Sequence, residues 1–91
     1  MRQEKRHKLQ LFYDIISAVE DNMIDSKSAR PTHVQHYSRL SYDKMLNYAD
    51  ELEKKGMIFR GTSGLVSVTD KGREFTQQYS QLINLIESAG L

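Results

Sequence analysis

The sequence predicts a mainly α-helical fold with one small β-hairpin and a long C-terminal helix. Apolar residues recur at helical spacings in several segments, and β-branched and aromatic runs flank a single tetrapeptide bounded by glycines. With 91 residues the chain has the size of one domain, and 38% hydrophobic residues suffice for a modest core that needs no cross-links. We therefore expect one compact domain.

The first helix is expected from Lys8 to about Ile24. Its apolar residues follow one another at spacings of three and four, which places them on one helical face. This face comprises Leu9, Phe12, Ile16, Val19 and Met23, widened by Leu11, Ile15 and Ala18. The polar residues 25–30 indicate a loop that ends in a short extended stretch, because the ring of Pro31 disfavours helix in the preceding residue.

Two further helices are expected in close succession. The first, Pro31–Ser38, begins with a proline that suits an initial helical turn, and it can point Val34 and Tyr37 inward. Ser41 is a good N-cap for the second, Tyr42–Lys55. The buried stripe of this third helix consists of Met45, Ala49 and Leu52, flanked by Tyr42 and Leu46.

A β-hairpin is expected after this helix. Gly56 stands where a left-handed residue commonly ends a helix. The runs Met57–Arg60 and Leu65–Val68 are rich in β-branched and aromatic residues and flank the turn Gly61–Gly64. No lysine and helix follow these glycines at the spacing of a phosphate-binding loop, so we interpret them as a simple turn.

The last helix is expected from Asp70, with Thr69 as its N-cap. Residues 70–89 would span ~30 Å, which is longer than a small core needs. A heptad-like seam runs along it through Gly72, Phe75, Tyr79, Leu82, Ile86 and Ala89. The other side is neutral and polar from Gln77 to Asn84, which suits pairing with an antiparallel partner helix.

Charge is segregated along the chain, although the formal net charge is only +1. Residues 1–8 hold four bases against one acid, residues 9–25 hold four acids and no base, and residues 26–48 hold four bases against one acid. This arrangement permits a basic face that could bind a polyanion. Scattered solubilising charge explains the same composition equally well.

Composition also excludes several classes of function. The absence of cysteine excludes a disulfide scaffold, a thiol nucleophile and thiolate zinc sites, and it fits a reducing cytoplasm. No segment approaches the ~18 apolar residues of a membrane span, and the N-terminus has no secretory apolar region. No nucleophile elbow is present either. We expect a cytoplasmic protein that is not an enzyme, contacts no membrane and needs no cofactor.

The expected order of elements is typical of a helix-turn-helix followed by a wing, the name we use for the hairpin. Several short motifs add to this order of elements: Pro31-Thr32-His33-Val34, Leu40-Ser41-Tyr42, Tyr48 followed by Leu52, Gly56-Met57-Ile58, and Thr69-Asp70-Lys71-Gly72-Arg73-Glu74-Phe75. With these motifs the chain resembles the small archaeal winged helix-turn-helix proteins, which include dimeric chromatin-associated members. The resemblance covers about residues 8–88. Ala49 and the short wing with a single base depart from the family pattern.

The resemblance implies that the third helix is the recognition helix and enters the major groove of DNA. Asn47 would then pair with adenine and Lys44 with guanine or phosphate, while Ser41 and Thr32 would contact phosphates beside the helix starts. The full candidate set is Arg30, Thr32, His33, His36, Ser41, Tyr42, Lys44, Asn47, Tyr48, Arg60, Thr62 and Ser63. Taken alone, Lys44, Asn47 and Tyr48 each fit an ordinary solvated position better than a DNA contact, whereas the expected fold favours contact.

Two features of this region point elsewhere. Asp50 and Glu51 would repel phosphates, so they argue against deep insertion of the C-terminal half of the third helix. His33 and His36 lie one helical turn apart and could share a metal ion, but no third ligand has suitable spacing, so no metal site is expected. Protonated histidines would instead add positive charge to this face.

The resemblance also implies a homodimer through the C-terminal helix. The candidate dimerisation residues are Phe75, Tyr79, Leu82, Leu85, Ile86 and Ala89. An alternative is that Phe75, Tyr79 and Leu82 close the core of the monomer. Both can hold if residues 82–91 alone face a partner. We accordingly divide the compact domain into a DNA-binding part, residues 1–69, and a dimerisation helix, residues 70–91.

The expected function is double-stranded DNA binding, sequence-dependent or general, by a small transcriptional regulator or a nucleoid-associated chromatin protein. The alternative is a winged-helix module that binds proteins and has lost DNA binding, and Asp50, Glu51 and the thin wing favour it. A sensor of small molecules is a third possibility, for which the sequence offers no pocket motif.

Overall fold

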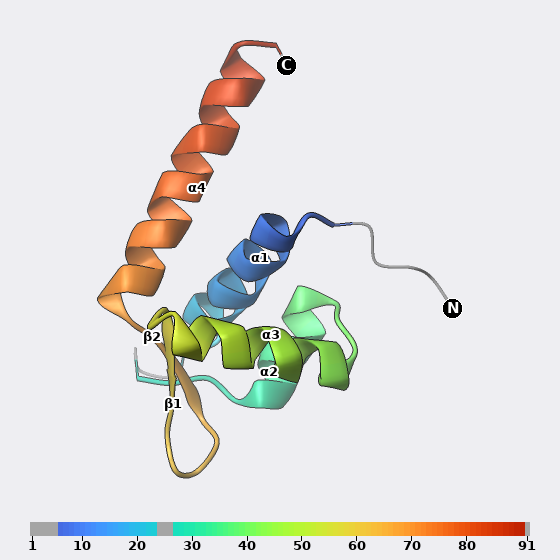
Figure 1. Cartoon of the computed structure of the whole chain (residues 1–91), viewed down its shortest axis with the longest axis vertical. Helices are drawn as coiled ribbons and strands as arrows, with labels where there is room; N and C mark the ends of the chain where they lie inside the picture. Colours follow the sequence, from blue (N-terminus) through green and yellow to red (C-terminus); the bar gives the residue numbers. More distant parts are fainter. Residues whose placement is uncertain (1–5, 24–26, 91) are drawn as a thin grey trace.

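The computed structural model describes residues 6–23 and 27–90, and within them four helices and one hairpin follow one another in the expected order. Three helices and the hairpin form the body, and the last helix leaves it at one side (Figure 1). The elements are α1 (Lys8–Asp21), α2 (Pro31–Ser38), α3 (Tyr42–Lys54), β1 (Ile58–Arg60), β2 (Val66–Val68) and α4 (Asp70–Ser88). The prediction of a mainly helical winged helix-turn-helix with a long C-terminal helix is confirmed.

Helices α1, α3 and α4 begin at residues whose side chains accept a free backbone N–H group, whereas Arg30 before α2 makes no such bond and that helix opens with Pro31. Ser41 Oγ accepts the N–H of Lys44 at 3.3 Å, and Thr69 Oγ1 accepts that of Gly72 at 3.1 Å, as expected for N-caps. Helix α1 ends at Asp21, earlier than expected, because Asn22 closes it by donating its side-chain amide to the Ala18 carbonyl. Ile24, to which this helix was expected to extend, lies outside the described residues.

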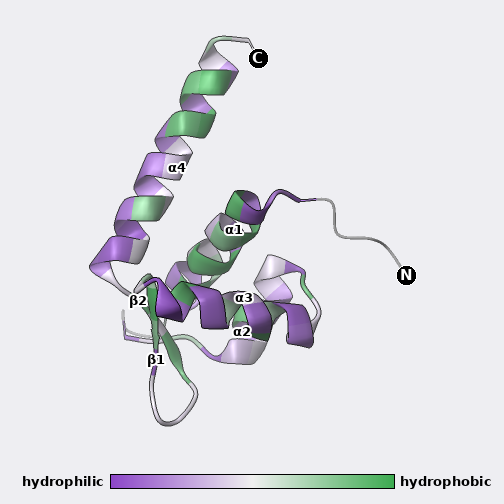
Figure 2. Ribbon diagram, viewed as in Figure 1, coloured by the Kyte–Doolittle hydropathy of each residue, from purple (hydrophilic) through white to green (hydrophobic). Residues whose placement is uncertain are grey.

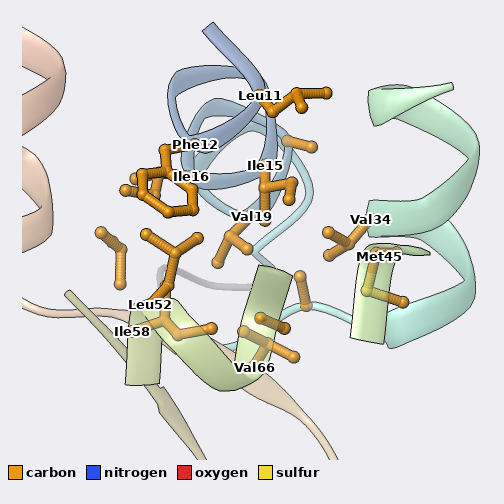
Figure 3. Packing of buried hydrophobic residues seen from close by; sticks show 14 of the residues in the cluster. Leu11, Phe12, Ile15, Ile16, Val19, Val34, Met45, Leu52, Ile58 and Val66 are labelled. Carbon is orange, nitrogen blue, oxygen red and sulfur yellow. The ribbon is translucent and has the colours of Figure 1, made fainter. Parts of the chain in front are cut away.

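The core is built around α1. Ile15, Ile16 and Val19 are completely buried, with residues of α2, α3 and the hairpin on the surrounding sides (Figure 3). The expected face is confirmed except at its first residue, because Leu9 is 45% exposed, whereas Leu11 and Ala18, which were expected to widen the face, are buried. The buried face is wide because α1 contacts α2, α3, α4 and the sheet.

The inward face of α2 also differs from the expectation. Val34 is buried, but Tyr37 is 62% exposed and Ser38 occupies the inward position. Ser38 and Val34 are four residues apart and so lie on one face, and Ser38 Oγ donates to the Val34 carbonyl at 2.7 Å. The serine can therefore be buried with its hydroxyl satisfied. Tyr37 lies on the outer side, where its ring meets His36 edge-on.

The hairpin is antiparallel, with Ile58 opposite Val68 and Arg60 opposite Val66. Ala29 adds a third extended piece, because its N–H and C=O both bond to Val66, at 2.6 and 2.8 Å. The extended stretch expected before Pro31 is thus confirmed, and it ties the segment between α1 and α2 to the base of the wing.

Helix α4 has two distinct halves. Its first half packs on α1 and β2, and its last turns stand clear of the other described elements (Figure 1). Hydrophobic residues continue along this protruding part, whereas α3 carries mostly hydrophilic residues (Figure 2). None of the helices in the described part of the chain combines the length and the hydropathy that crossing a bilayer requires.

Candidate nucleic-acid interface

The outer face of α3 is held on a rigid support. Met45, Ala49 and Leu52 are buried on its inner side, as the sequence predicts, which leaves Lys44 and Asn47 exposed on the opposite side. Lys44 forms no ion pair with any residue in the ranges 6–23 and 27–90, so its ammonium group faces solvent. A cation and a carboxamide thus project from the N-terminal half of α3.

Most of the other candidate residues lie just before or on α2 and at the start of α3. Arg39 adopts a left-handed conformation with φ of 58°, which ends α2 and turns the chain toward the buried Leu40 and the capping Ser41. The exposed candidates in this part of the chain are Arg30, Thr32, His33, His36, Ser41 and Tyr42, of which His36 belongs to the last turn of α2. All six are therefore accessible on the helix-turn-helix.

The acidic half of α3 is paired within the molecule. Glu51 forms an ion pair with Lys8 of α1 at 2.8 Å, and Asp50 forms an ion pair with Arg60 of the wing. Arg60 also pairs with Glu53 at 2.7 Å. The carboxylates that argued against DNA binding in the sequence therefore face bases from other elements, which reduces their repulsion of phosphates.

Arg60 differs most from its expected role. Its guanidinium is held against α3 by Glu53 and Asp50, and its side chain is only 27% exposed. The hydrogen bonds that the guanidinium donates to Glu53, and next to Asp50, raise the pKa of Arg60 above its ordinary value. Residues 61–68 contain no charged side chain, so the wing tip presents the exposed hydroxyls of Thr62 and Ser63 instead of a base.

Tyr48 also lies partly inside the molecule. Its ring packs edge-on against Phe12 of α1 with centroids 6.1 Å apart, and the residue is only partly exposed. Tyr48 thus helps to hold α3 against α1.

The candidate dimerisation residues fall into two groups. Tyr79 meets Tyr13 of α1 at 5.0 Å and so belongs to the contact between α4 and α1, and Phe75, which stacks on Tyr79 at 5.8 Å, packs against the core. Gly72, which the seam included, is buried against the backbone of Met57. The second group is exposed and consists of Leu82, Leu85, Ile86 and Ala89. Leu91 lies outside the described residues.

The described residues form no metal site and line a small cavity between α1 and α4. Within the described ranges no three histidine, aspartate or glutamate side chains converge as metal ligands would, and His33 and His36 both face solvent. A cavity of about 240 Å³ lies between α1 and α4, lined by Gln10, Tyr13, Tyr79, Ser80, Ile83 and Asn84. This cavity was not foreseen from the sequence, because its lining residues come from segments about seventy positions apart. It is smaller than the ~300–1,000 Å³ of ordinary ligand pockets.

Comparison with known proteins agrees with this geometry. A family model described as winged helix-turn-helix matches residues 5–87. The fold is similar to that of Sso10a-2, a DNA-binding protein from Sulfolobus solfataricus, with a TM-score of 0.72, 21% identity and coverage of 92% of this chain and 85% of that protein. It is also similar to MepR, a transcription regulator of the Staphylococcus aureus multidrug efflux pump MepA. Here the TM-score is 0.67 and the identity 10%, with coverage of 90% of this chain and 59% of MepR. Comparison with curated proteins gives no significant match.

Proposed function

The chain belongs to the winged helix-turn-helix family, and on this premise we propose that it binds double-stranded DNA. The observation that carries the proposal is the outer face of α3, where Lys44 and Asn47 are exposed and the acidic residues behind them are paired with bases. The proposed role is that of a transcription regulator or a chromatin-associated protein, which acts by binding and not by catalysis.

In the proposed complex the N-terminal half of α3 enters the major groove, which is ~12 Å wide and admits one helix. Asn47 would read an adenine through two hydrogen bonds, and Lys44 would contact guanine or phosphate. Arg30, Thr32 and Ser41 would hold the backbone on either side. The hydroxyl of Ser41 accepts the Lys44 N–H, so its own hydrogen remains available for a phosphate oxygen.

Binding is tested by fluorescence anisotropy on a random duplex at several salt concentrations. Each lost phosphate contact lowers the slope of log K against log salt by about 0.9, so Lys44→Ala and Arg30→Ala should each flatten it. Lys71→Ala serves as the matched control, since Lys71 is an exposed base on the first turn of α4, next to the opposite end of α3. An unchanged slope in the Lys44→Ala, Arg30→Ala double variant would contradict the proposed face.

Sequence readout is a separate expectation. Asn47→Ala should leave the salt slope unchanged and relax the preference at one base pair by ~1–3 kcal/mol, if selection from random duplexes yields a preferred site. Lys54→Ala on the same helix removes a base from the far end of α3 and should not change that preference.

Arg60 would support the interface indirectly, by masking Asp50 and Glu53. Arg60→Gln should therefore weaken binding, and Asp50→Asn in the same chain should restore part of the affinity because one unmasked carboxylate is then removed. A phosphate contact by Arg60 predicts the opposite pattern. In that case the salt slope falls by about 0.9 and Asp50→Asn brings no recovery.

We further propose that two chains pair through the protruding part of α4. Leu82 is 50% exposed, Leu85 67% and Ile86 37%, and together with Ala89 they form an apolar strip that the rest of the described molecule does not cover. Monomers seldom leave such a strip bare. An antiparallel pairing would separate the two wings and let one dimer bind two segments of DNA. Residues 1–69 then act as the DNA-binding part and residues 70–91 as the dimerisation helix.

The assembly is tested by analytical ultracentrifugation at high micromolar concentration. Leu82→Glu with Ile86→Glu puts four carboxylates into one dimer interface and should yield a folded monomer that binds long duplexes more weakly, since avidity is lost. Gln78→Glu with Gln81→Glu adds the same charge at exposed polar positions of the same helix as a control. A wild-type protein that sediments as a monomer would refute the dimer.

A further inference from the structure

A chain of polar contacts runs from α4 to the turn of the helix-turn-helix. The Tyr79 hydroxyl donates to Gln10 Oε1 at 3.1 Å, and Gln10 Nε2 donates to Asp14 Oδ1 at 2.7 Å. Asp14 Oδ2 accepts from Arg6 at 2.7 Å. The same guanidinium donates to the carbonyls of Ser38 and Arg39, at 2.8 and 3.3 Å. Four side chains thus join the middle of α4 to the last residues of α2.

The last hydrogen bonds of this polar network are made to the turn between α2 and α3, which determines the position of α3. Ser38 is the last residue of α2, and Arg39 takes the left-handed conformation that redirects the backbone into α3. Carbonyls at a helix C-terminus lack intrahelical partners and attract cations. A non-glycine residue with positive φ is also strained, so it needs support from its surroundings. The Arg6 guanidinium supplies both the cap and the support.

Most links of this network are partly buried, and only the bond from Arg6 to the Arg39 carbonyl is exposed. The side chains of Arg6 and Asp14 are only 26% and 23% exposed, and Gln10 and Tyr79 lie partly buried between α1 and α4. One oxygen of Asp14 accepts from Gln10 and the other accepts from Arg6. A change at Gln10 therefore alters the hydrogen bond between the carboxylate and Arg6, and a change at Arg6 alters the bond to Gln10. Hydrogen bonds that share a group in this way are energetically coupled.

We propose that Arg6, Asp14 and Gln10 are positioning residues. Through them, the packing of α4 against α1 at Tyr79 fixes the orientation in which α3 contacts DNA. None of these residues belongs to the proposed contact face, and they act by fixing the turn after α2. This inference rests on the proposed DNA binding, because the position of α3 matters to the duplex only if α3 binds it. It predicts that the Tyr79 hydroxyl on α4 affects the affinity for DNA.

The decisive comparison uses two tyrosines of the same contact. Tyr79→Phe removes the start of the polar chain, while Tyr13→Phe removes the neighbouring hydroxyl that bonds to Ser80 Oγ at 3.0 Å and is not part of it. Both variants lose one hydrogen bond between α1 and α4. On a short duplex with room for one protomer, Tyr79→Phe should weaken binding about threefold and Tyr13→Phe should not, since one hydrogen bond is worth roughly tenfold at most.

Coupling is then measured with Asp14→Asn. If the four side chains of the polar network act as a unit, Asp14→Asn weakens DNA binding, and adding Tyr79→Phe to it lowers the affinity little further. Equal effects of Tyr79→Phe and Tyr13→Phe, or additive losses in the double variant, would overturn the proposal. Ultracentrifugation of each variant separates this effect from a change in assembly.

Hydrogen exchange of the backbone provides a readout that does not need DNA. The amides of Arg39 and Leu40 bond back to His36 and Gln35 and report on the turn. Tyr79→Phe and Asp14→Asn should accelerate their exchange, and Tyr13→Phe should leave it unchanged. A wild-type protein that binds no duplex but shows this pattern would refute the proposed function alone. Normal DNA binding with unchanged exchange and affinity in Tyr79→Phe would refute the positioning role alone.

Discussion

Gly72 is a site where a single methyl group should have a large effect. A Cβ at this position of α4 would lie 2.2 Å from the Met57 carbonyl oxygen and 2.8 Å from Cγ2 of Val68. The Met57 oxygen cannot simply retreat, because it accepts the Thr69 N–H at 3.1 Å. Overpacking costs ~1–3 kcal/mol. Since the obstacle is backbone and a hydrogen bond of ~1 kcal/mol is disturbed as well, we expect a cost near the upper end of this range.

A helical alanine recovers part of that cost, because it is favoured over glycine by ~1 kcal/mol. Gly72→Ala should therefore lower the free energy of unfolding by ~2 kcal/mol, which corresponds to a fall in Tm of about 10 °C for a domain of this size. Thermal unfolding followed by circular dichroism measures the change. Gly61→Ala is the control, since its Cβ would meet nothing closer than 4.0 Å. A Gly72→Ala protein as stable as the wild type would refute the close-approach argument.

Two further stability predictions concern the N-cap and the buried face of α3, and both are tested by urea unfolding. Ser41→Ala should cost ~1 kcal/mol because the Lys44 N–H loses its capping partner, and Ser63→Ala, at an exposed position of the wing tip, should change little. Leu52→Ala should cost ~2–5 kcal/mol, because the side chain is completely buried between α3 and α1. Leu9→Ala, at a 45% exposed position, should cost less than half as much, and equal losses at the two leucines would contradict the observed core.

The features that sequence predicts well are those fixed by neighbours along the chain. The caps Ser41 and Thr69 and the helix-ending Gly56, with φ of 78°, depend on local backbone chemistry and were all located correctly. The buried stripe Met45, Ala49 and Leu52 of α3 was also correct, although Tyr42, expected at its flank, is 44% exposed because it lies at the first turn of the helix. Only one face of that helix meets the core, so its 3.6-residue period is visible in the sequence.

The features that sequence missed depend on residues far apart in the chain. Nothing near Arg60 shows that its guanidinium points to Asp50 and Glu53, since the hairpin must first fold back on α3. Tyr37 was misplaced because apolar character alone favours the tyrosine over Ser38 as the buried residue. The fold instead buries the smaller side chain, whose hydroxyl is satisfied by its own helix.

A chain with a formal net charge of +1 can present a face to a polyanion only if its acids and bases are sorted in space. The ion pairs of α1 and α3 achieve this sorting, since they join Arg6 to Asp14, Lys8 to Glu51, and Arg60 to Asp50 and Glu53. Lys44 takes part in none of these pairs, so its charge remains available to phosphate. The pairs themselves are partly exposed, so salt screens them as well as any contact with DNA. The total salt slope of the wild type therefore mixes both effects, and the number of phosphate contacts must be taken from slope differences between variants such as Lys44→Ala and Lys71→Ala, in which the masking pairs are unchanged.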